Sequence, residues 1–218
     1  YTGDDCIAGF GNVNVFVSHC VMNSACSAMR FGGTNVLVEN CRMFGPCKYF
    51  FRGSLSDDEK RSGCMLAQNG RKNMLSAFTY YADYSLPIAK QPGNIIIKNC
   101  KVENADKLLH YNYSGTETWQ KNRPLADITF ENISISGMTL PSILCGAPEL
   151  PVSLALKNVD ADAGDGCGIP SFINAQNFSE IKLKNFRLKN FRGAAVILKR
   201  GDGEIYAKDI DISDAALE

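Results

Sequence analysis

The sequence has no excess of charge of either sign. The 23 Lys and Arg residues balance 23 Asp and Glu residues, so the formal net charge is zero. Proteins that bind nucleic acids usually carry a basic excess, and the composition therefore argues against such a partner. There is also no run of about 18 apolar residues, the length that crosses a membrane as a helix. We therefore expect no membrane-spanning segment.

Cysteine is abundant, but no C-x-x-C pair occurs among the nine cysteines. This absence makes a zinc ribbon or a thioredoxin-like motif a poor interpretation. Cys20, Cys41 and Cys100 each follow a similar apolar strand pattern. We expect these three thiols to be interior and mainly reduced, because a free cysteine behaves as a small buried hydrophobe. The sequence predicts no metal site and no cofactor.

A strand pattern recurs along the chain. Aliphatic residues alternate with variable ones, and each copy ends in a short polar residue followed by an apolar one. The copies begin 21, 59, 33, 26, 27 and 24 residues apart. They read NVFVSHC (14–20), NVLVENC (35–41), NIIIKNC (94–100), DITFENI (127–133), SLALKNV (153–159), EIKLKNF (180–186) and EIYAKDI (204–210).

A period of about 20–30 residues with strand signals is typical of a solenoid rather than of a sandwich. The spacers lack a leucine-rich-repeat consensus, so the pattern predicts an all-β parallel β-helix of about seven coils. Residues 1–218 form a single domain in this interpretation. The interval of 59 residues between two copies is long enough for one additional coil and an insertion, which we place at about residues 56–92.

The sixth position of the repeat is polar in every copy. An asparagine amide there can hydrogen-bond from one coil to the next, as identical polar side chains do in other stacked sheets. Asparagine also tolerates the left-handed backbone of a tight bend. We therefore expect a stack of asparagines at one bend of the coil. The column reads His19, Asn40, Asn99, Asn132, Asn158, Asn185 and Asp209.

A second strand is expected midway through each unit, and an acidic doublet heads this second sheet. Asp4 and Asp5 precede the apolar run at 6–8. Adjacent strand residues point to opposite faces, but both carboxylates can reach solvent at a bend just before the strand. The other second strands are expected at 27–31, 49–53, 108–112, 141–145 and 194–198.

The stretch TGDDCIA (2–8) resembles the Gly-Asp-Asp-Cys motif of the polygalacturonase-like glycoside hydrolases, family 28, which are right-handed parallel β-helices. The stretch from Arg123 to Val159 is similar to the C-terminal coils of that family, including a Gly-x-Pro-Glu-x-Pro turn at 146–151. The resemblance covers most of the chain. It implies hydrolysis of glycosidic bonds with inversion, with Asp4 as the general acid and Asp5 as the water-activating base.

Other motifs of the family differ in this chain. Cys26-Ser27-Ala28 stands in place of its Gly-His-Gly, and Arg52-Gly53-Ser54 matches its Arg-x-Lys only in part. The family's third catalytic Asp lies one coil before the doublet. We expect preceding coils, stacked on residues 1–30, to carry that group, and the chain by itself to have weak activity.

Basic and aromatic side chains complete the candidate site. Arg30 and Arg52 are expected in equivalent columns of the two coils after the doublet, where guanidinium groups could bind the carboxylates of acidic sugars. A structural ion-pair cluster is the alternative interpretation of these charges. His110 is a candidate to replace the missing family histidine, and Tyr111 follows it. Packing at the core or rim is the alternative for both residues.

The sequence therefore predicts a hydrolase of a polysaccharide that is pectin-like or otherwise contains uronate. A lyase or epimerase on the same fold is disfavoured, because it would need Ca²⁺ held by several carboxylates and only the doublet is clustered. A non-catalytic carbohydrate-binding or structural β-helix is the third alternative, since the histidine and the third Asp are missing. A secreted or periplasmic location is expected for the hydrolase.

Overall fold

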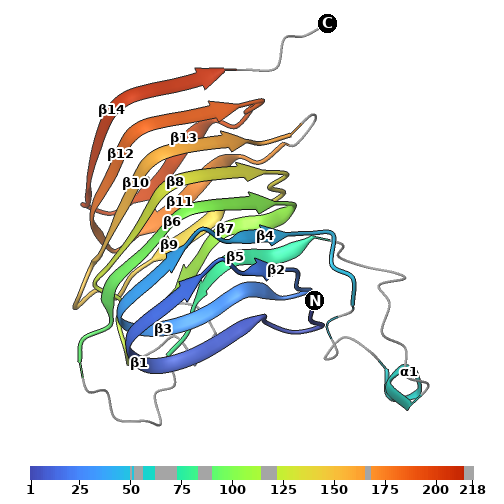
Figure 1. Ribbon diagram of the computed structural model, residues 1–218. Coiled ribbons are helices and arrows are strands. Elements are labelled where there is room, and N and C mark those ends of the chain that lie inside the picture. Colours follow the sequence, from blue (N-terminus) through green and yellow to red (C-terminus); the bar gives the residue numbers. More distant parts are fainter. Residues whose placement is uncertain are drawn as a thin grey trace, which may run out of the picture.

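The computed structural model describes residues 1–49, 51, 56–61, 73–82, 90–113, 122–164 and 168–213. This part of the chain is all-β apart from one short helix (Figure 1). The elements are β1 (Ile7–Ser18), β2 (Val21–Met22), β3 (Ser27–Glu39), β4 (Arg42–Phe44), α1 (Asp57–Arg61), β5 (Met74–Tyr80), β6 (Gly93–Glu103), β7 (Ala105–Asn112), β8 (Asp127–Ser136), β9 (Ser142–Cys145), β10 (Val152–Asp162), β11 (Ser171–Gln176), β12 (Phe178–Lys189), β13 (Ala195–Arg200) and β14 (Glu204–Ser213).

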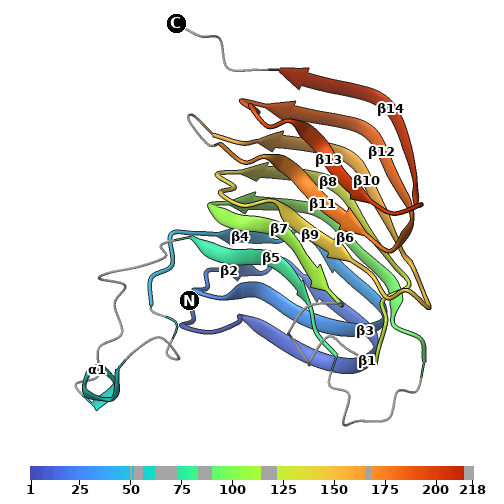
Figure 2. The same ribbon diagram turned by 180° about the vertical axis from the view of Figure 1, so that it is seen from behind.

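The order of strands in the sheet shows how the chain winds. On one side of β3 lie β5, β7, β9, β11 and β13, and on the other side lie β6, β8, β10, β12 and β14. Successive strands therefore alternate between the two sides, and the sheet curls around a common core, as both views show (Figures 1 and 2). The pairings between these strands are parallel. This arrangement is a parallel β-helix-like solenoid, as the repeat predicts.

Most of the expected second strands are present. Those at 27–31, 108–112, 141–145 and 194–198 correspond to part of β3 and to β7, β9 and β13. The strand expected at 49–53 lies mostly outside the described residues, and β5 is the strand that pairs with β3 at this level. β5 lies within the range 56–92, so a strand of the regular coil occupies part of the range that the sequence assigns to an insertion. The repeat pattern also missed β11.

The interior is built from aliphatic columns that run along the solenoid. Alternate residues of each strand point inward, and the parallel register places each inward residue beside its counterpart in the next coil. Burying one such side chain contributes about 1.5–3 kcal/mol relative to leaving it exposed. One fully buried column consists of Val36, Ile95, Ile128, Leu154 and Ile181.

The predicted asparagine stack is confirmed. Every residue of the column from His19 to Asp209 has a positive φ, between 49° and 57°. The Nδ2 group of Asn132 donates to Oδ1 of Asn99 at 2.8 Å, and Asn158 and Asn185 repeat this bond to the preceding coil at the same distance. Each amide therefore satisfies a neighbour while its backbone makes the bend.

A second ladder of asparagine amides, which the sequence pattern did not predict, lies at the first position of the repeat. Asn35 donates to Oδ1 of Asn14 at 3.0 Å, and Asn94 donates to Oδ1 of Asn35 at 2.9 Å. These three residues also have positive φ. The signal was visible, because the first three copies of the repeat all start with asparagine.

The prediction for the cysteines is confirmed for Cys41 and Cys100, which are buried free thiols, and Cys20 is partly buried. Each thiol donates to the carbonyl two residues earlier, at 3.4 Å for Cys20, 3.2 Å for Cys41 and 3.1 Å for Cys100. Within the described ranges, no helix is long and apolar enough to cross a membrane.

Asn158→Ala is expected to lower the free energy of unfolding. The change removes one donated and one accepted amide bond and leaves a Cβ-bearing residue at a φ of 52° without a polar side chain. We expect a loss of about 2–4 kcal/mol, measured by urea unfolding. Lys157→Ala, at the exposed neighbouring position, is the control and should change stability by about 0.5 kcal/mol or less. Equal stability of the two variants would contradict the role of the ladder.

Cys100 is expected to make stability depend on alkaline pH. Burial raises the pKa of its thiol from 9.0 to about 11. The folded protein therefore holds this proton more tightly than the unfolded chain, and the resulting stabilisation is present below pH 9 and is lost as the pH rises towards 11. Cys100→Val, which lacks the thiol, should lose less stability over this interval in urea unfolding. An identical pH dependence in the two proteins would show that the thiol is not the cause.

Candidate active site

The backbone of the acidic doublet is fixed against the following coil. The hydroxyl groups of Thr2 and Ser24 both donate to the carbonyl of Asp4. The amide of Thr2 donates to the carbonyl of Asn23 at 2.9 Å. Ser24 is fully buried, so its side chain is a rigid support. The doublet therefore lies in an anchored turn just before β1, as the sequence predicts.

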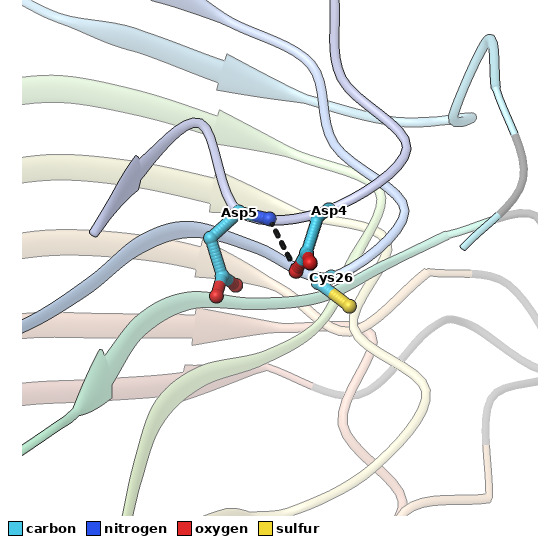
Figure 3. A group of neighbouring side chains, drawn as sticks. All are labelled: Asp4, Asp5 and Cys26. Carbon is cyan, nitrogen blue, oxygen red and sulfur yellow. Dashed lines mark hydrogen bonds between the residues drawn. The ribbon is translucent and has the colours of Figure 1, made fainter. Parts of the chain in front are cut away.

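The two carboxylates lie close to Cys26 (Figure 3). One oxygen of Asp4, one oxygen of Asp5 and the Cys26 sulfur are all within 4.8 Å of one another. The backbone N–H of Asp5 donates to Oδ1 of Asp4 at 2.8 Å. Two carboxylates and one thiol match neither the all-oxygen shell of Ca²⁺ nor the four ligands of a structural zinc site. The group therefore gives no basis for assigning a metal.

Asp5 is the more enclosed member of the doublet, with a side chain that is 6% exposed. Its Oδ1 accepts the backbone N–H of Ser27 at 2.9 Å, and its Oδ2 accepts Nη1 of Arg30 at 3.3 Å. Burial raises the pKa of the Asp5 carboxyl above its ordinary value, and the charge of Asp4 adds to this rise. The Ser27 N–H and the Arg30 charge act in the opposite direction but do not cancel the rise.

Arg30 joins the doublet to an aromatic pair. Its guanidinium carbon lies 4.3 Å from the centroid of the Tyr81 ring, and Phe10 meets the same ring edge-on at 5.2 Å. Stacking of this kind holds a guanidinium in place. The Arg30 side chain is 31% exposed, so it can also contact a ligand. The structure thus brings Asp4, Asp5 and Arg30 together, as expected.

The other candidate residues do not all join this group. Arg52 lies outside the described residues. The register pairs Arg30 with Thr79, and Thr79 with His110, so Thr79 holds the position next to Arg30 in the following coil. His110 lies two strand spacings, or about 10 Å, from Arg30 along the solenoid. It is buried on the same side as Lys107, with Nδ1 3.3 Å from the Lys107 Nζ.

Tyr111 is not a substrate-binding residue. Its side chain is fully buried, and its ring packs against Tyr80 at 4.9 Å. Its hydroxyl accepts the backbone N–H of Leu125 at 3.0 Å. The assignment to the site was wrong because Tyr111 follows His110 in a strand, and adjacent residues of a strand point to opposite faces. Tyr111 belongs to the core.

Sequence reasoning missed a cluster of buried hydroxyl groups beside the doublet. Ser27 lies 2.8 Å from the Thr79 hydroxyl, and Ser76 is 2.5 Å from Thr79 and 3.2 Å from Ser27, all measured between hydroxyl oxygens. The register continues this column from Ser76 to Lys107. A repeated spacing of three between polar residues, as in Ser27 and Arg30, Ser76 and Thr79, and Lys107 and His110, could have revealed it. These residues lie in 27–31, β5 and β7, and β9, β11 and β13 continue the same side of the sheet. We call this side, formed by 27–31, β5, β7, β9, β11 and β13, the doublet face.

Comparison of the chain with protein families, curated proteins and solved structures finds no match in any of the three. A function can therefore be inferred only from the geometry and chemistry of the doublet face.

Arg30→Gln is expected to raise the pKa of Asp5 further, because it removes an ion pair that favours the charged carboxylate. The pKa can be followed by NMR titration of the Asp5 carboxyl carbon. Arg42→Gln, which removes a guanidinium paired with the distant Glu103, is the matched control and should leave Asp5 unchanged. An Asp5 pKa that stays the same or falls in Arg30→Gln would contradict the described geometry.

Proposed function

We propose that this chain is the catalytic part of a glycoside hydrolase that acts on a uronate-containing polysaccharide. The observation that carries the proposal is the contrast within the doublet. Asp5 is enclosed and has a raised pKa, whereas its neighbour Asp4 is exposed. Two carboxyl groups in one site with such different environments favour an acid and a base for hydrolysis of a glycosidic bond.

The environments favour roles opposite to those that the resemblance implies. Burial raises the pKa of Asp5, a direction that suits a general acid, and in this role Asp5 would donate a proton to the glycosidic oxygen as the bond to the anomeric carbon breaks. Asp4, exposed to solvent, is the better base and takes a proton from the water that attacks that carbon. We therefore propose Asp5 as the acid and Asp4 as the base.

The spacing of the doublet limits where the attacking water can be. Inverting hydrolases separate their two carboxyl groups by about 6.5–9.5 Å to fit a water between them. One oxygen of each carboxylate lies within 4.8 Å of the other here. This spacing is closer to the separation of about 5–5.5 Å in retaining enzymes. Inversion, which we keep as part of the proposal, is therefore tested below by the anomer of the first product.

The preference for uronate rests on the charge of Arg30, which lies beside the acids and is 31% exposed. Lys107 and His110 follow about 10 Å further along but are buried, so Arg30 is the group beside the doublet that can meet a carboxylate. A guanidinium or ammonium group favours a sugar that carries a carboxylate. A neutral glycan can accept hydrogen bonds from this group but does not gain the charge pairing.

The finer description of the fold is also proposed. We infer a right-handed β-helix of about seven coils, supported by the strong right-handed preference of crossovers between parallel strands.

We further propose that the protein acts outside the cytoplasm, in a secreted or periplasmic location, because a polysaccharide substrate does not cross membranes.

Asp4→Asn and Asp5→Asn are each expected to lower hydrolysis by at least about 100-fold, since each removes a positioned acid or base. The assay measures release of reducing ends from pectin-like and other uronate-containing glycans by the protein. Asp202→Asn, at an exposed position of the turn before β14, is the matched control and should keep full activity.

Three outcomes separate the alternatives. Full activity in both doublet variants would overturn the catalytic assignment. Products that absorb as unsaturated sugars would indicate a lyase, and binding without turnover would indicate a carbohydrate-binding β-helix. The anomer of the first product, read by NMR, tests inversion: a retained configuration would make the closely spaced pair an acid and a nucleophile.

A further inference from the structure

The doublet face carries a hollow of mixed polarity, far from the acids. It has a volume of about 180 Å³ and lies over β7, β9, β11 and β13. This is smaller than the roughly 300–1,000 Å³ of pockets that enclose drug-sized ligands, so it suits a ligand of about one sugar ring. Its lining includes Ile143, Asn174, Leu198 and Arg200.

Strand register places this hollow in line with the candidate active site. The column that holds Arg30 and His110 continues to Ile143, Asn174 and Leu198. Asn174 is four strand spacings from Arg30, or about 19 Å along the solenoid. The hollow therefore lies on the same face as the doublet but several sugar rings away from it.

The polar side chains of the hollow are suited to an anion. Arg200 is exposed and supplies the positive charge, and it forms no ion pair within the described part of the chain. The hydroxyl of the fully buried Ser171 donates to Oδ1 of Asn174 at 2.6 Å, which leaves the Nδ2 amino group as the polar atom that Asn174 offers to a ligand. No acidic side chain of the described residues lines the hollow.

Its apolar side chains are suited to the face of a sugar ring. Ile143 and Leu198 flank Asn174 in the same column, and Leu198 is 43% exposed. An apolar surface beside amide and guanidinium donors fits a ring that has one C–H face and one carboxylate edge. We propose that this hollow is a distal binding site for a single uronate unit, which holds a glycan chain along the doublet face. The identity of the ligand rests on the proposed function, while the anion site itself does not.

The direct test is binding of monosaccharides. D-galacturonate and D-glucuronate should shift the backbone NMR signals of residues 143, 174 and 198–200, whereas D-galactose should not. Arg200→Gln should weaken uronate binding by at least about tenfold, because it removes a charged hydrogen-bond donor. Lys199→Gln removes the same charge from the adjacent residue, which points to the opposite side of β13, and should bind like the parent. The thermal unfolding midpoint of each variant verifies that it is folded.

Two further measurements keep this inference separate from the proposed function. Asp5→Asn should bind the monosaccharides normally, and Arg200→Gln should raise KM for long uronate chains without changing kcat. Retained binding with no hydrolysis by the parent protein would defeat the proposed function and leave the distal site standing. Equal binding of galactose and galacturonate, or uronate binding that Arg200→Gln does not weaken, would overturn the distal site.

Discussion

The structure depends on one constraint: each coil must bend at the same place as the coil before it. Fourteen non-glycine residues in the described ranges have a positive φ, and all of them except His19 and Asp209 are asparagines. Asparagine tolerates this backbone, and its amide can bond to the same residue of the neighbouring coil. The bends therefore define the register, and a slip of one residue would turn every buried side chain outward.

A fixed register assembles the candidate site from distant parts of the chain. Asp5 contacts Ser27 and Arg30 in the next coil, and the hydroxyl of Ser27 contacts that of Thr79 one coil further. None of these contacts is local in sequence. Because strand spacing is about 4.8 Å, each added coil moves the site along the solenoid by a constant step. Loops alone would not hold side chains at such regular intervals.

The sequence was informative wherever the repeat was regular. The asparagine column, the inward aliphatic residues and the buried Cys41 and Cys100 all result from spacing and alternation. It was misleading across the long interval between two copies, because counting residues could not locate β5. The residue beside Arg30 in the next coil is therefore Thr79 rather than the arginine that the sequence predicts. Tyr111 was misassigned because proximity in sequence to His110 took precedence over strand alternation. The burial of Asp5 depends on packing between coils, which no local pattern reveals.

The solenoid also explains why side-chain chemistry, not the fold, would set the ligand. A linear polymer and a stack of coils both repeat at a constant interval, so one face can meet many successive units of a chain. On the doublet face Arg30 and Arg200 are the accessible cations that line the two sites described, Lys107 is buried beside His110, and the other positions of the column are hydroxyl, amide and aliphatic. In the proposed function, such a face would hold a polyanion at separate points rather than at every unit. The coils that carry accessible positive charges would then decide which sugar units must carry carboxylates.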